Sequence, residues 1–150
     1  MEERGHAEAR RGVSELINMV GIDFNRLATF RYAIVTTVST EGYPWSIPTE
    51  FEVTAKHEIL LQKPIWSNAF TGKQVGVLFN HISAIPTGGY TDRRYMLVWG
   101  HLTESGGKLK LTPEKISEWD EKILPFDQLC AKSGPQGQKY LEKHSRQIEA

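Results

Sequence analysis

The chain has 150 residues with 18 basic and 18 acidic side chains, so its formal net charge is zero, and its length fits one domain of ordinary size. A neutral chain lacks the basic excess typical of nucleic-acid-binding proteins and of polybasic membrane attachment, so we expect no nucleic acid and no membrane as partner. No apolar run approaches the roughly 18 residues of a membrane span. The single cysteine, Cys130, excludes an intrachain disulfide, and the charged N-terminus does not look like a secretory signal, so the sequence predicts a cytoplasmic protein.

Hydrophobic periodicity predicts a helix from residue 6 to residue 20. Four apolar side chains recur there at helical spacing, and Gly21 follows as a stop signal. The four are Val13, Leu16, Ile17 and Val20.

From Tyr32 the pattern changes to short, β-branched, alternating segments, which are typical of strands. We expect six of them, over residues 32–39, 45–53, 58–62, 74–82, 94–102 and 108–111. Six strands in a row between helical segments predict a mainly β fold, either an antiparallel barrel or a sandwich with helical additions.

After the last strand the pattern again predicts helices. Thr112 is a candidate N-cap, Pro113 occupies the first helical position, and an apolar stripe of Ile116, Trp119 and Ile123 follows. Residues 124–137 are expected to break this helix, and a polar helix is expected to close the chain. The predicted organisation is one domain over residues 1–150, with an N-terminal helix at 1–21, a barrel at 28–111 and C-terminal helices at 112–150.

Two prolines lie four residues apart here: Pro44 directly precedes the second predicted strand and Pro48 lies within it. Backbone nitrogens alternate sides along a strand, so residues 44, 46 and 48 point theirs the same way, and Ser46 is the only donor on that side. This side of the strand cannot form a full ladder. It is either an edge that proline protects from aggregation, or a gap in a barrel where a flat ligand meets backbone groups.

The stretch EGYPWSIPTEFEV, followed by the short strand EILLQ, resembles the split-barrel flavin-binding proteins related to pyridoxamine 5'-phosphate oxidase. The likeness rests on Gly42, Pro44 and Pro48, and on a later strand with a glycine, here Gly100, and it covers roughly residues 28–104. The resemblance implies a six-stranded antiparallel split β-barrel with flanking helices. It also implies a homodimer that holds FMN at the subunit interface.

Departures from the family pattern separate this chain from the vitamin B6 oxidases themselves. Ile47 and Glu52 stand where those enzymes carry an arginine and a lysine that serve the FMN phosphate. Ser67 matches a family serine, but Asn68 and Ala69 replace the basic pair that follows it. The helix that usually comes next is missing as well, so we expect a shortened relative rather than a vitamin B6 oxidase.

Two loops offer donors for a phosphate group, which needs charge-assisted hydrogen bonds and backbone amides. The first follows the third predicted strand, where the family places the phosphate, and the second is TGGYTDRR, with Gly88, Gly89, Arg93 and Arg94. Either can also be a solvated connection rich in turn-forming residues. The first loop provides Lys63, Ser67, Asn68, Thr71, Gly72 and Lys73.

By the same resemblance, the isoalloxazine ring lies on the backbone from Pro48 to Glu50, with Gln62 near its polar edge. Trp45, Trp66 and Trp99 are candidates to stack on the ring, although strand aromatics more often belong to a core or an interface. The predicted cofactor-binding residues are Ser46, Pro48, Thr49, Glu50, Gln62, Lys63, Ser67, Asn68, Thr71, Lys73 and Trp99.

Other chemistry has weaker support in the sequence. The five histidines show neither the spacing of a helical zinc site nor a cysteine partner, so no metal site is predicted. Haem binding, known for some split-barrel relatives, would need one of them as axial ligand. Cys130 lacks a histidine partner in sequence, and no serine lies in a G-x-S-x-G elbow. The catalytic residues are unassigned, with Tyr32, Tyr43, Tyr95 or a histidine as the available proton donors.

Three hypotheses follow. The first is a cytoplasmic, homodimeric FMN-dependent oxidoreductase of unknown substrate, with a deazaflavin as the alternative cofactor. The second is a carrier or sensor of a flavin, a deazaflavin or haem without turnover, and the third is a cofactor-free split barrel that serves as an interaction protein. The visible spectrum of the purified protein separates the third from the other two, and reduction by a nicotinamide donor separates the first from the second.

Overall fold

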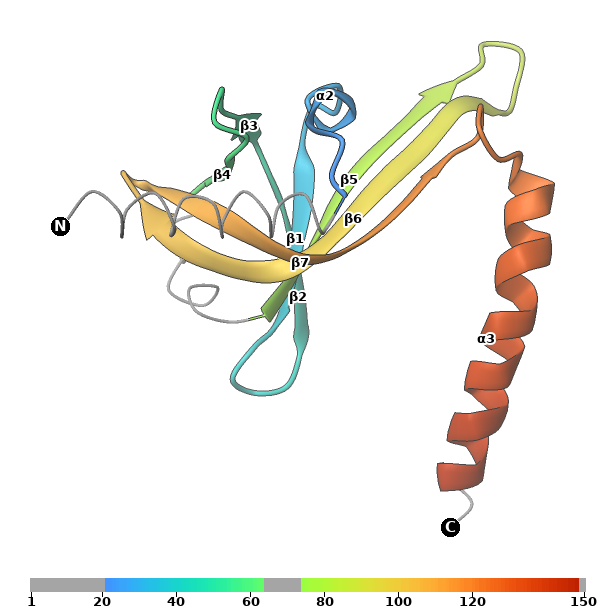
Figure 1. Cartoon of the computed structure of the whole chain (residues 1–150). Coiled ribbons are helices and arrows are strands. Elements are labelled where there is room, and N and C mark those ends of the chain that lie inside the picture. The colour runs from blue at the N-terminus through green and yellow to red at the C-terminus, as the bar shows by residue number, and fades with distance from the viewer. Residues whose placement is uncertain (1–20, 64–73, 149–150) are drawn as a thin grey trace, which may run out of the picture. The chain divides into compact units, whose positions relative to one another are not determined.

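The structure is a computed structural model that describes residues 21–63 and 74–148 (Figure 1). The helix predicted at residues 6–20 and most of the first candidate phosphate loop lie outside these residues. The described residues form two compact units. Unit 1 comprises those of Met1–His81 together with Tyr95–Glu118, and unit 2 comprises Ile82–Arg94 together with those of Trp119–Ala150.

The described chain is mainly β, with one antiparallel sheet that curls into a half-barrel in unit 1 and a long C-terminal helix in unit 2 (Figure 1). Its elements are α2 (Phe24–Leu27), β1 (Ala33–Val38), β2 (Pro44–Thr49), β3 (Phe51–Val53), β4 (Ile59–Gln62), β5 (Gln74–Ala84), β6 (Tyr90–Ser105), β7 (Lys108–Asp120) and α3 (Phe126–Ile148). The strand order is β2-β1-β5-β6-β7-β4-β3. The described sheet has seven strands rather than the expected six, because the segment predicted as one strand divides into β2 and β3 at Glu50.

The two prolines lie on the open edge of β2. Ser39 donates its N–H to the Tyr43 carbonyl at 2.8 Å, next to the first residue of β2. In an antiparallel pair, every second residue exchanges hydrogen bonds with the partner strand. Counting on from Tyr43, the odd-numbered residues of β2 are therefore the ones that bond to β1. The nitrogens of Pro44 and Pro48 therefore face away from β1, where the strand order places no further neighbour. The predicted open ladder is confirmed, since β2 is an edge of the described sheet.

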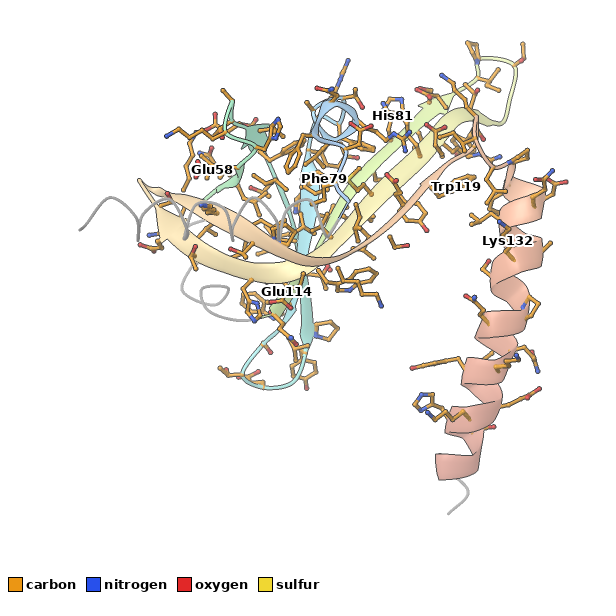
Figure 2. The ribbon with its side chains drawn as sticks, in the orientation of Figure 1. Glu58, Phe79, His81, Glu114, Trp119 and Lys132 are labelled. Atoms are coloured by element: carbon orange, nitrogen blue, oxygen red, sulfur yellow. The ribbon has the colours of Figure 1, made fainter. Side chains whose placement is uncertain are left out.

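The core of unit 1 lies on the inner face of the half-barrel. Phe79 of β5 is fully buried there, and its ring meets Phe51 of β3 edge-on at 4.8 Å between centroids (Figure 2). Its ring also lies 6.2 Å from that of Phe30. One core thus serves the strands on both sides of the split. The buried apolar residues are Ile22, Leu27, Phe30, Ala33, Val35, Ile59, Leu61, Val75, Val77, Phe79, Met96, Val98, Leu102, Leu109 and Leu111.

The prediction of a helix beginning at Thr112 is wrong, because this segment continues β7. Leu109 and Leu111 are buried, whereas farther along it is Ile116 that packs against the core. This change from odd to even positions indicates one extra residue in β7, as in a β-bulge. Gly100 of β6 lies against this point, and a Cβ atom there would be 2.0 Å from the carbonyl oxygen of Thr112. Close backbone approach therefore requires glycine at position 100.

The predicted break at residues 124–137 is also wrong, because α3 starts at Phe126 and continues through Pro135. Its first turn is fixed to β6 within unit 2. Glu121 accepts hydrogen bonds from the Nε and the backbone N–H of Arg93, at 2.7 and 3.2 Å. The Arg93 guanidinium lies over the ring of Phe126, with its carbon 4.8 Å from the centroid, and 5.9 Å from the ring of Trp119, which is labelled in Figure 2.

Candidate functional site

Four of the predicted cofactor-binding residues meet where the chain leaves β2 for β3. Thr49 ends β2, Glu50 follows it, Gln62 ends β4 and Lys63 comes next. The Gln62 N–H donates to the Glu50 carbonyl at 2.9 Å, and the Thr49 hydroxyl donates to the Gln62 carbonyl at 3.2 Å. The first bond continues the β3–β4 ladder, and the second joins the end of β2 to the end of β4. We call this group of four residues the junction.

Strand pairing explains why the junction forms at Glu50. The residue before it, Thr49, is in register with Ala33 of β1, and the residue after it, Phe51, is in register with Leu61 of β4. Glu50 belongs to neither strand and is exposed. Its carbonyl is held by Gln62, so the crossing from one edge to the other takes a single residue.

Two hollows adjoin the junction, and Gln62 lines both. The inner one encloses about 10 Å³ between apolar core residues, which is room for about one water molecule. The outer one is larger, about 150 Å³, and more polar. Sites for drug-sized ligands enclose about 300–1,000 Å³, so neither hollow alone has the volume of a flavin site. The outer hollow is lined by Glu50, Phe51, Glu52, Leu60, Gln62 and Lys108.

The cationic member of the junction, Lys63, forms an ion pair with Glu104 of β6. A second pair borders the outer hollow, where the Lys108 ammonium lies 2.7 Å from a carboxylate oxygen of Glu52. Both pairs are partly exposed to solvent. An anion that binds at the junction must therefore compete with a carboxylate for its lysine.

Ser46, Pro48 and Trp99 are not part of the junction. Ser46 and Pro48 alternate with Thr49 along β2, so their side chains point to its other face. The Ser46 hydroxyl lies 2.8 Å from that of Thr36, its partner in β1. On this face Thr36 is in register with Gly76 of β5, where a Cβ atom would lie 3.8 Å from the ring of Trp99.

This face therefore carries a row of small residues that ends at an indole. The row comprises Ser46, Thr36, Gly76 and Trp99. The Lys115 ammonium lies 5.1 Å from the centroid of the Trp99 ring, within cation–π range. Nearby in the same two strands, the Nδ1 of His101 contacts the carboxylate of Glu114, and Figure 2 shows Glu114 across the β6–β7 ribbon from Phe79.

The second candidate phosphate loop has its arginines engaged within unit 2. Arg93 is held by Glu121, and its hydrogen bonds, the side-chain bond foremost, lower the pKa of the Glu121 carboxyl below its ordinary value. The Arg94 Nε lies 3.7 Å from Asp92. Gly88 donates its N–H to the Ile85 carbonyl at 2.9 Å and, like Gly89, has a positive φ, so the glycines shape the β5–β6 turn.

Ser67, Asn68, Thr71 and Lys73 lie outside the described residues, as does Trp66. Among the residues that the structure describes, no three His, Cys, Asp or Glu side chains group as metal ligands. Neither described helix combines the length and apolar character needed to cross a membrane.

Sequence reasoning missed Glu104, Thr36 and Lys115. Glu104 lies 41 residues from Lys63, and no local pattern connects the two. Gly76 did carry a signal, since a glycine inside a strand often marks a close approach.

Comparisons with protein-family models, with curated proteins and with solved structures found no significant match to this chain.

Proposed function

We propose that the chain is an FMN-binding flavoprotein with a split-barrel fold, and that it acts in the cytoplasm as a homodimeric FMN-dependent oxidoreductase. The observation that carries this proposal is the junction. There the ends of β2 and β4 bring the Gln62 side chain and the Lys63 ammonium to one place, where the chain passes from β2 to β3.

The donor set at the junction fits a flavin. The Gln62 amide carries both a donor and an acceptor, which suits the alternating acceptors and N–H of the ring's pyrimidine edge. Lys63 provides a compact charge for the phosphate. Gln62 is exposed, and Lys63 is partly exposed in its ion pair with Glu104, so a phosphate can reach it by displacing that carboxylate.

The small volume of the hollows supports the proposal that a second copy of the chain completes the cofactor site. The outer hollow, about 150 Å³, is smaller than a typical ligand site. Unit 1 also exposes large apolar side chains on β1 and β2 and in their connection, with exposed fractions of 58% for Val38, 65% for Tyr43 and 42% for Trp45. Exposed apolar patches of this kind mark interaction surfaces, and a two-fold homodimer is the commonest way to close one.

Bound FMN would supply the electron chemistry, and the chain would supply position and electrostatics. Gln62 would orient the ring by its amide, Lys63 would hold the phosphate, and the Thr49–Gln62 bond would keep the two edges together beneath the ring.

A comparison of FMN with riboflavin tests the proposal. Charged hydrogen bonds contribute about 1.5–3 kcal/mol each, so the contact of Lys63 with the phosphate should make FMN bind about 10- to 160-fold more tightly than riboflavin. Flavin fluorescence quenching measures both affinities, and Lys63→Ala should weaken only the binding of FMN. Equal affinity of the wild-type protein for the two flavins would contradict the proposed phosphate site.

Two further measurements address turnover and assembly. Bleaching of the flavin absorbance by a nicotinamide donor is expected of an oxidoreductase, whereas a bound flavin that stays oxidised would indicate a carrier or sensor. Light scattering behind a sizing column should give about twice the chain mass of 17.0 kDa. A monomer at tens of micromolar would contradict the shared cofactor site.

A further inference from the structure

The ion pair between Lys63 and Glu104 reaches across a strand. Lys63 follows β4 and Glu104 lies near the end of β6, and the strand order places β7 between these two strands. The two residues are therefore not neighbours in one ladder, and their long side chains meet across the width of two strand spacings. It is partly exposed, with 34% of the Lys63 side chain and 51% of the Glu104 side chain accessible to solvent.

We propose that Glu104 holds Lys63 until a phosphate monoester displaces it, and that this competition weakens the binding of FMN. This inference rests on the proposed FMN site. The carboxylate of Glu104 has one negative charge, and a phosphate monoester has between 1.5 and 2 at neutral pH, in the manner of a phosphorylated side chain. A dianion can take the lysine from a carboxylate, whereas an uncharged ligand cannot. Glu104 thereby lowers the affinity for any ligand that needs Lys63, FMN included, and leaves the affinity for riboflavin unchanged.

The chain offers a matched control in Glu52. It pairs with Lys108 at 2.7 Å, is as exposed as Glu104 at 51%, and borders the outer hollow beside Gln62. Glu52→Gln removes the same charge from the same end of the sheet but leaves Lys63 and Glu104 paired. A general change in surface charge would affect both variants alike, and only displacement at Lys63 separates them.

The experiment compares the wild-type protein with Glu104→Gln and Glu52→Gln by flavin fluorescence quenching. FMN and riboflavin are titrated at one low ionic strength, because exposed charges are screened by salt. An exposed ion pair contributes about 0.2–1 kcal/mol, so releasing Lys63 should tighten FMN binding about 1.4- to fivefold. Riboflavin binding should not change in either variant, and FMN binding to Glu52→Gln should stay within the error of the wild-type value.

The outcomes are distinguishable. Tighter FMN binding by Glu104→Gln alone supports the inference. If FMN binds the wild-type protein but Glu104→Gln leaves its affinity unchanged, weakens it, or changes riboflavin affinity equally, Glu104 does not act through Lys63 and the inference is overturned while the FMN site stands. Tightening by Glu52→Gln alone would move the phosphate to Lys108 and overturn it too. If none of the three proteins binds FMN, both the proposed function and the inference are wrong.

Discussion

Replacing Gly100 by alanine tests the packing of β6 against β7. The new Cβ atom would lie 2.0 Å from the carbonyl oxygen of Thr112, 2.9 Å from its carbonyl carbon and 3.2 Å from the Cα of Pro113. These are backbone atoms, so no side-chain rotation relieves the clash. Because nonbonded carbon atoms are best separated by about 3.5–4.0 Å, the two strands would have to move apart by about 1 Å or more.

We expect Gly100→Ala to cost about 3 kcal/mol of unfolding free energy, at the upper end of the 1–3 kcal/mol typical of overpacking. For a chain of this length, that corresponds to a fall of about 6–12 °C in the melting temperature. Urea unfolding followed by circular dichroism measures the free energy directly.

Gly76→Ala is the matched control, because it makes the same change in the adjacent strand β5. Its Cβ would lie 3.7 Å from a Leu97 methyl and 3.8 Å from the Trp99 ring, which are ordinary contacts. We expect this variant to stay within about 0.5 kcal/mol of the wild type, or to gain slightly from the lost flexibility of glycine. A Gly100→Ala protein as stable as Gly76→Ala would refute the close approach of Thr112.

Three other variants test the core and unit 2. Phe79→Ala should lower the free energy of unfolding by about 3–5 kcal/mol, because a fully buried ring that contacts two other rings leaves a cavity; a loss below about 1 kcal/mol in urea unfolding would contradict this core. The lowered pKa of Glu121 means that its contact with Arg93 stabilises the fold above the ordinary carboxyl pKa, and that this stabilisation is lost as pH falls through the lowered value. We therefore expect the α3 ellipticity at 222 nm to depend on pH in the wild type and Glu121→Gln to abolish this dependence. Identical pH titrations of the variant and the wild type would exclude this role of Glu121. Arg93→Ala should reduce that ellipticity yet leave FMN affinity unchanged, since its guanidinium binds Glu121, and loss of FMN binding would return the phosphate to the β5–β6 turn.

Sequence reasoning succeeded where backbone chemistry leaves few choices. Pro44 and Pro48 cannot donate a hydrogen bond, so an open ladder follows from residue type alone, and β2 is indeed an edge. Alternation in 74–82 and 94–102 likewise located the central parts of β5 and β6. In both cases the signal lies within the segment itself.

Sequence reasoning failed where tertiary pairing overrides a local pattern. Thr112 and Pro113 look like a helix start, but pairing with β6 holds them in β7, and the extra residue there disguises the alternation of Leu111 and Ile116. Pro135 was expected to help end a helix that in fact passes through it. At the junction, the family resemblance placed Gln62 and Glu50 beside the same ligand, but Glu104 was out of reach, because it lies 41 residues from Lys63 and no local pattern connects the two.

The strand order also has a consequence for the order of folding. The β1–β2 hairpin joins residues as close as Val38 and Pro44, whereas the β4–β7 ladder joins Leu60 to Lys110, which are 50 positions apart. Closing a long loop costs chain entropy, so pairs of residues that are distant in sequence form late. We therefore expect β4 and the short β3 beside it to dock on β7 after the β1–β2 hairpin has formed. The same segments should open first in the native protein, since β3 has three residues at a sheet edge. Amide hydrogens of Phe51–Val53 should therefore exchange before those of β5, which places the junction in the least protected part of the half-barrel.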